Sequence, residues 1–343
     1  MGGLAASVPR DTRRSRRPGG AAVARWVVVA VLLVTGATVA VVAARAATGP
    51  DPASARWALG DVTPDRMQPV PPSPAPGPDA STGSWTEDCG RNTERHRNAD
   101  NMVVAEGQVG AAQHRHDYVG NTSADAHSTA ASLAAASTTC PDGDLSAFYW
   151  PVLRDSSAVT TDGDAGNAGI IDPASVRITY HGNAAGAVVA PPSMLMLTVG
   201  ESRAVLAGTV ARAASRVRWG CSGARGRFAA EYPRCPPGDL VVRTFDFPSC
   251  WDGARLDSPD HRDHVTYPDQ RGVCPPTRFA VPQLELSVGY RVPDGVRPVI
   301  DAVPGQRREA VTDHAHAVVL LPPALSRSLV GCLNQGRRCE GGR

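Results

Sequence analysis

The chain has 343 residues, of which 42% are hydrophobic, and its net charge is only +2. This balance leaves no excess of cationic side chains to neutralise phosphates, so it argues against a nucleic-acid partner. All 35 basic residues are arginine, which excludes catalysis through a Schiff-base lysine.

Residues 1–25 form a basic tail, and an uncharged apolar run follows from Trp26 to Ala44. As a helix rising ~1.5 Å per residue, this run spans about 28 Å, close to the thickness of a bilayer core. We therefore predict one transmembrane signal anchor over 26–47, with the tail on the cytoplasmic side. A cleaved signal peptide is the alternative, because Ala44–Ala46 offers small residues at cleavage spacing. The downstream chain is predicted to be extracellular, held at the cell membrane in the first case and secreted in the second.

Residues 48–84 are rich in Pro, Ala, Ser and Gly. Such a composition cannot bury a core and favours an extended spacer. We predict that the folded extracellular domain occupies residues 85–343, which is long enough for one substantial core.

All eight cysteines lie in this exported domain, and an even number in an oxidising compartment argues for disulfides. The sequence leaves many pairings open. Pairing between neighbours along the chain predicts Cys221–Cys235, Cys250–Cys274 and Cys332–Cys339, and it leaves Cys89–Cys140. No C-x-x-C pair occurs, which argues against zinc-ribbon and thioredoxin-like sites.

Strand-type segments dominate the domain, because runs rich in β-branched and aromatic residues are bounded by Gly, Pro or Asp. These runs cover 147–153, 176–182, 193–199, 217–222, 240–248, 279–292 and 315–321. Two segments are predicted to be helical, an alanine-rich one over 123–137 and one over 323–336 that starts with proline and ends in glycine. We predict a mainly β fold, a single β-sandwich-like domain with a few peripheral helices.

Three histidine pairs are candidates for a site. His114 and His116 are two residues apart, as are His314 and His316, and this spacing puts both rings on one face of a strand. His261 and His264 are three apart in a stretch that also carries Asp257, Asp260 and Asp263 and that prolines mark as a loop.

Two kinds of chemistry suit these residues. Neutral imidazoles could ligate Zn²⁺ or Cu²⁺, with carboxylates orienting them from behind, or a His–Asp pair could act as a general base. The bland explanation is that histidines beside Asp, Pro and Tyr satisfy loop carbonyls. The predicted reactive cluster consists of His114, His116, Asp117, Asp252, Asp260, His261, His264 and Tyr267. Its predicted metal ligands are His114, His116, His261 and His264.

Four ordered blocks of the sequence resemble the DUF1996 family. They read "GQVGAAQHRHDYVGN", "CPDGDLSAFYWPVL", "FPSCWDGARLDSPDHRDHVTYP" and "GVCPPTRFAVPQLELSVGY". The resemblance runs from about Asp88 to Cys332 and implies a secreted domain of the kind found in actinobacteria and fungi, sometimes joined to carbohydrate- or cell-wall-binding modules. Carried over by position, it marks as recurring residues His114, His116, Cys250, Trp251, Asp252, Ser258, His261 and His264. Near the end, where the family pattern has His-Ala-Asp, this chain has His316 in place of the aspartate.

Three functions fit these features. The first is a membrane-anchored extracellular hydrolase or lyase that acts on a glycan or another cell-envelope polymer. In it, the histidines would react, Asp117, Asp252 and Asp260 would orient them, and Tyr267 would donate a proton. The second is a non-catalytic module that binds cell-wall polysaccharide, and the third is a metal-scavenging surface protein. The reactive cluster exists only if histidines far apart in the chain meet in the fold.

Overall fold

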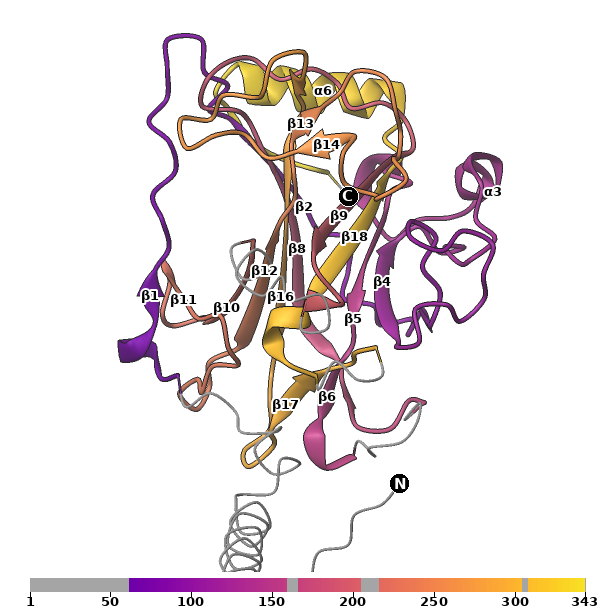
Figure 1. Cartoon of the computed structure of the whole chain (residues 1–343), viewed down its shortest axis with the longest axis vertical. Coiled ribbons are helices and arrows are strands. Elements are labelled where there is room, and N and C mark those ends of the chain that lie inside the picture. Colours follow the sequence, from indigo (N-terminus) through magenta and orange to yellow (C-terminus); the bar gives the residue numbers. More distant parts are fainter. Residues whose placement is uncertain (1–61, 159–165, 205–215, 304–307, 343) are drawn as a thin grey trace, which may run out of the picture. The chain divides into compact units, whose positions relative to one another are not determined.

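In a computed structural model, the structure describes residues 62–158, 166–204, 216–303 and 308–342. This part of the chain is mainly β, with several sheets and few helices, as predicted (Figure 1). The predicted basic tail, the predicted membrane anchor and the first part of the predicted spacer lie outside the described residues. Among the residues that are described, no helix has the length and apolarity needed to cross a bilayer.

The larger of the two main sheets has six strands. In spatial order these are β10 (Val217–Cys221), β12 (Val241–Asp246), β16 (Gln283–Tyr290), β8 (Pro173–His181), β2 (Ser84–Glu87) and β19 (Arg338–Glu340). Neighbouring strands are antiparallel except for β19 and β2, which are parallel. The sheet thus joins residues near both ends of the described chain.

The second main sheet has five strands and carries the candidate site. Its spatial order is β3 (Arg97–Asn98), β4 (His116–Gly120), β5 (Ala147–Pro151), β18 (His314–Val319) and β9 (Leu195–Gly200). Every pairing in it is antiparallel. Strand β18 therefore lies two places from β4, although about 200 residues separate them in the chain.

Three small sheets complete the β structure. They consist of β1 (Gln68–Pro69) with β11 (Arg227–Phe228), then β14 (Val265–Thr266), β13 (Cys250–Trp251) and β15 (Phe279–Ala280), and then β17 (Pro298–Ile300), β6 (Leu153–Asp155) and β7 (Ile170–Ile171). Short 3-10 turns occur at Pro64–Arg66, Pro141–Gly143, Ser156–Ala158 and Ala310–Thr312.

One hydrophobic core is shared by the two main sheets. Ile178 and Leu286 of the six-stranded sheet belong to the same buried cluster as Phe148 and Leu197 of the five-stranded sheet. Because side chains alternate along a strand, the residues between these positions point away from the shared core. For the five-stranded sheet, we call the face that points away from this core the outer face.

A buried ion pair crosses the shared core. Arg243, on β12, donates from Nε to Asp313 Oδ2 at 2.9 Å, and its Nη2 bonds Asp313 Oδ1. Its Nη1 also donates to the Pro151 carbonyl at 2.8 Å, at the end of β5. Both charged side chains are fully buried. The pair therefore links the six-stranded sheet to the start of β18, where His314 follows Asp313.

The two predicted helices differ in outcome. The C-terminal helix α6 (Pro323–Asn334) lies as predicted, whereas α3 (Ala130–Ala135) is much shorter than the predicted 123–137. Thr129 caps α3 by accepting from the Ser132 amide. Before it, Asp125 Oδ1 accepts from the His127 amide, which favours turns over helix. Hydrogen bonds to polar side chains thus replace helical backbone bonds in part of the segment whose alanine content predicts a helix.

All four predicted disulfides are present: Cys89–Cys140, Cys221–Cys235, Cys250–Cys274 and Cys332–Cys339. The structure has no free cysteine. Part of the predicted spacer also contacts the domain, because Met67 packs with Cys221 and Ala229, and β1 pairs with β11.

Candidate functional site

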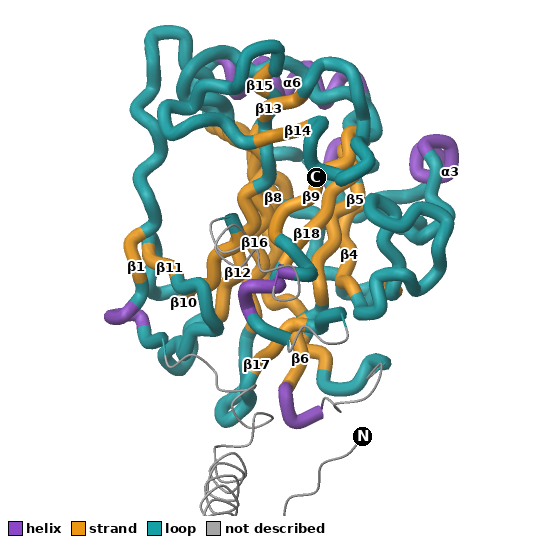
Figure 2. Tube along the Cα trace, in the orientation of Figure 1, coloured by secondary structure: helices purple, strands orange, loops and turns teal. Residues whose placement is uncertain are grey.

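The candidate site lies on the outer face of the five-stranded sheet. In register, His116 is opposite Pro151, and Tyr149 lies between Tyr118 on β4 and His316 on β18. Loop residues Met102 and Val103 pack over this face in a second buried cluster, which also contains Tyr118 and Tyr149. Figure 2 shows loop segments beside β4. Aromatic and imidazole rings thus gather between a sheet and its covering loop.

Three histidine rings converge there. The centroid of His114 is 4.6 Å from that of His116 and 5.0 Å from that of His314, and the centroids of His116 and His314 are 5.7 Å apart. One nitrogen from each ring lies within 4.8 Å of the others. We call these residues, His114, His116 and His314, the three-histidine centre.

Backbone carbonyls fix which nitrogen of each ring faces inward. Nδ1 bonds the Ala112 carbonyl at 2.6 Å in His114, the Asp100 carbonyl at 3.1 Å in His116 and the Thr312 carbonyl at 2.9 Å in His314. A carbonyl oxygen only accepts, so each Nδ1 donates its proton. In a neutral ring, Nε2 then carries a lone pair.

These three lone pairs need a shared partner. Nε2 of His114 and Nε2 of His314 are 3.0 Å apart, and the buried Nε2 of His116 has no hydrogen-bond partner among the described residues. A single proton between the first two would leave His116 unsatisfied. A metal ion at ~2.0–2.1 Å from each nitrogen would satisfy all three, and angles near 90–110° would put the nitrogens about 2.9–3.4 Å apart. The 3.0 Å between His114 and His314 lies in this range, and the nitrogen of His116 lies within 4.8 Å of both. The chemistry of the donor set suits a divalent transition metal.

The fourth histidine on this face already has two partners. His316 Nε2 bonds Asn101 Nδ2 at 3.0 Å, and its Nδ1 bonds Thr198 Oγ1 at 3.1 Å. The Asn101 amide is oriented by the Tyr149 hydroxyl, which donates to its Oδ1 at 2.8 Å. Asn101 Nδ2 is therefore the donor and His316 Nε2 the acceptor. The His316 ring lies beside the three-histidine centre and is not one of its candidate ligands.

Burial keeps these rings neutral. It lowers the pKa of His114 to about 4 and lowers the pKa of His116, His314 and His316 well below the usual value. Neutral imidazole is the form that coordinates metal.

The second predicted pair lies in a different setting. His264 is buried and bonds Ser258 Oγ through Nδ1 at 2.9 Å and the Met196 carbonyl through Nε2 at 2.7 Å. His261, a quarter exposed, bonds Asp257 Oδ2 at 2.8 Å. No hydrogen bond or ring contact joins either residue to the three-histidine centre within the described ranges. The loop approaches the sheet through β9, which pairs with β18.

Four other predicted site residues have local partners. Asp117 points away from His116 and accepts from Asn92 at 2.7 Å and from Arg97 at 2.6 Å. Asp252 accepts from the Arg255 amide at 2.9 Å, and Asp260 accepts from the Ser258 hydroxyl at 2.7 Å. The half-buried Tyr267 donates to the Asp246 carbonyl at 2.8 Å. None of the four hydrogen-bonds to the three-histidine centre.

The structure thus brings His114 and His116 together with His314, which was absent from the predicted cluster. Its signal was present, because two H-x-H pairs on strands of one sheet can share a face. Asn101 and Tyr149, which orient His316, carry no motif that could have marked them.

A second group of titratable side chains lies beside the Cys89–Cys140 disulfide. Glu87 and Asp144 are buried near one another, and each has one oxygen without a hydrogen-bond partner among the described residues. Burial and the Asp144 charge raise the pKa of Glu87 to about 9. Both cysteines of this group are in a disulfide, so a shared proton, and not a metal, explains it.

We expect the free energy of unfolding to fall as pH rises from about 4.3 towards 9, because the unfolded chain releases the Glu87 proton first. A glutamine keeps position 87 neutral, so Glu87→Gln should flatten this decline. Urea unfolding at pH 5 and pH 8.5 measures it, with exposed Glu106→Gln as the control. Parallel pH profiles for the Glu87→Gln variant and the unmodified protein would contradict the shared proton.

Comparisons with known proteins add one family. The family model described as "Domain of unknown function (DUF1996)" matches residues 101–309. His114 and His116 lie inside the match, whereas His314 lies beyond it. No curated protein and no solved structure matches the chain.

Proposed function

Because the chain belongs to the DUF1996 family, whose description gives no activity, we propose a function from the site itself: a metal-dependent extracellular enzyme that hydrolyses a glycan or another cell-envelope polymer. One observation supports the proposal: a nitrogen from each of three buried rings converges, and the Nδ1 atoms of all three rings donate to carbonyls. Lyase-type elimination is the second reaction that such a centre suits.

The residues divide the work as follows. His114, His116 and His314 would hold the ion, Zn²⁺ being the first choice because three histidines with one open position form a known catalytic zinc set. Once bound, such an ion lowers the pKa of a coordinated water and polarises a substrate oxygen. The carbonyls of Ala112, Asp100 and Thr312 orient the rings, as second partners of metal-ligating histidines commonly do.

The non-catalytic polysaccharide-binding module remains the second candidate. It is favoured by the burial of the three histidines, which are only 5%, 0% and 3% exposed and so offer a polymer little surface. The experiment that separates the two is metal analysis of the full-length protein, followed by incubation with isolated envelope polysaccharide and measurement of new reducing ends. Hydrolysis that a chelator stops and Zn²⁺ restores is the expected result. Polymer binding without any change in chain length would favour the module.

We also propose that the domain is exported and held at the membrane by the 26–47 segment, and that its fold is sandwich-like. Four disulfides support an oxidising compartment. The core shared by the two main sheets supports the sandwich.

A further inference from the structure

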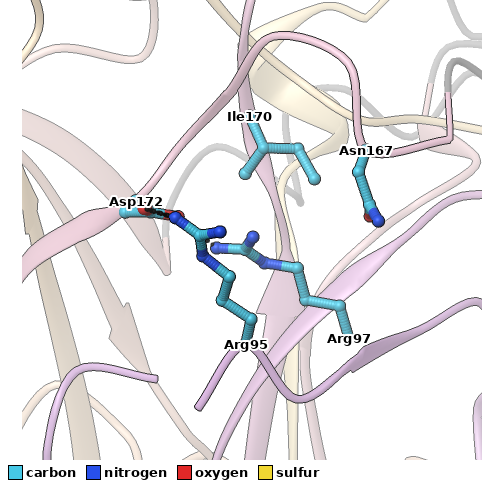
Figure 3. Close-up of a pocket in the computed structure, with 5 residues that line it drawn as sticks. All are labelled: Arg95, Arg97, Asn167, Ile170 and Asp172. Carbon is cyan, nitrogen blue, oxygen red and sulfur yellow. Dashed lines mark hydrogen bonds and ion pairs between the residues drawn. The ribbon is translucent and has the colours of Figure 1, made fainter. Parts of the chain in front are cut away.

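A small polar pocket lies at the edge of the five-stranded sheet, away from the three-histidine centre. Its volume is about 220 Å³, and it is lined by Arg95, Arg97, Asn167, Ile170 and Asp172 (Figure 3). Arg97 lies opposite Asp117 in the β3–β4 pairing, whereas Asn98 lies opposite His116. The pocket and the three-histidine centre therefore use opposite faces of the same strands.

The best-fixed group of the pocket is the Arg97 guanidinium. Its Nε donates to the buried Asp117 Oδ1 at 2.6 Å, and its Nη2 donates to Asp172 Oδ1 at 2.5 Å. Its side chain is 7% exposed, so it is held in place before any ligand arrives. Among the described residues, no acceptor takes Nη1 of Arg97. Preorganised donors of this kind cost little ordering entropy on binding.

The lining has two arginines and one aspartate, and the buried Asp117 that pairs with Arg97 brings the charges around the pocket into balance. Arg95 and Arg97 both contact Asp172, with Arg95 Nη2 at 3.5 Å from Asp172 Oδ2, and Arg97 is also paired with Asp117. An isolated anion or cation would find charges of both signs beside it. A sugar unit carries several hydroxyls that both donate and accept, so together they can use the guanidinium, the carboxylate and the Asn167 amide.

The volume of the pocket and the apolar part of its lining restrict the class of ligand further. Pockets for drug-sized ligands measure about 300–1,000 Å³, so this smaller pocket has room for one sugar ring of an oligosaccharide. Ile170 presents an aliphatic surface beside the polar groups, which suits the C–H face of a sugar.

We infer that the pocket is a subsite for one neutral saccharide unit of the polymer. This inference rests on the proposed function only in taking the polymer to be a glycan. Placed on the far side of β4 from the three-histidine centre, the subsite anchors a unit remote from the reacting bond.

Saturation-transfer NMR tests it with the full-length protein in detergent micelles. The probes are neutral tetrasaccharides of glucose, xylose, mannose and N-acetylglucosamine, with an oligouronate as the charged comparison. At least one neutral probe should bind, and Arg95→Ala or Asn167→Ala should weaken its binding about tenfold, as expected for loss of a hydrogen bond from a charged or polar group. Arg95 is largely exposed, so its removal leaves the fold intact.

The matched control is Arg271→Ala, because Arg271 forms an exposed pair with Asp269 outside the pocket. It should leave binding unchanged. The inference is wrong if no neutral probe binds at millimolar concentration, if only the oligouronate binds, or if Arg95→Ala and Arg271→Ala behave alike. The metal content of the same samples is measured in parallel. A failure of the subsite proposal therefore shows in saccharide binding, and a failure of the metal proposal shows in metal content.

Discussion

Replacing His314 with alanine is expected to weaken Zn²⁺ binding by more than 100-fold, whereas replacing His261 should leave it unchanged. Loss of a second partner behind a ligand costs about 10–100-fold in affinity, and loss of a ligand itself should cost more. His314 supplies one of the three converging ring nitrogens, and His261 is hydrogen-bonded to Asp257 in the 257–264 loop. The measurement is metal content by mass spectrometry after dialysis against limiting Zn²⁺.

Two controls make this result specific. His127→Ala removes an exposed histidine and should retain the metal. His314→Gln keeps a polar side chain of similar length, and thermal unfolding of both His314 variants shows whether the domain still folds. Metal retained by folded His314→Ala and lost from His261→Ala would favour the ligand set predicted from sequence over the three-histidine centre.

Arg243→Met should lower the free energy of unfolding by about 3–5 kcal/mol, the usual cost of removing one partner of a buried ion pair. It leaves Asp313 fully buried with no opposing charge, in a site where burial already raises the pKa of that carboxyl. It also removes the bond to the Pro151 carbonyl. Urea unfolding followed by tryptophan fluorescence gives the size of the loss.

Removing both charges tests whether the unpaired Asp313 carboxylate causes the loss of stability. The double variant Arg243→Met, Asp313→Leu should recover much of the stability, since no charge is then left buried alone. Arg271→Met, at an exposed pair, should change stability by no more than about 0.5 kcal/mol. If Arg243→Met behaves like Arg271→Met, the pair does not hold the two sheets together. Because His314 follows Asp313, we also expect weaker metal binding in Arg243→Met.

Much of the fold could be predicted from local sequence patterns. Runs such as 240–248 and 279–292 became β12 and β16, because their alternating side chains can face a core on one side. Pairing of neighbouring cysteines held because each predicted bond closes a short segment, apart from Cys89–Cys140. The helix over 123–137 was too long because helix propensity does not count the turns that Asn121 and Asp125 make with nearby amides.

The site depended on strand order, which local patterns do not contain. His114 and His116 meet His314 because β5 alone separates β4 from β18. Both β5 and β18 pack in the shared core, through Phe148 and Ala315. Nearby acidic residues favour the loop histidines as site residues in the sequence. In the structure, however, both ring nitrogens of His264 are hydrogen-bonded, one to Ser258 and the other to the Met196 carbonyl. Dense polar motifs in sequence can thus mark a well-bonded loop.

The same loop also covers part of an edge of the five-stranded sheet. Strand β9 lies at the edge of the sheet, where unpaired backbone groups could recruit a strand from another molecule. Here the Met196 amide donates to the Leu256 carbonyl and the Met196 carbonyl accepts from His264, so the loop occupies two of the bonds that an added strand would use. His264 thereby helps to block this edge against pairing with another chain.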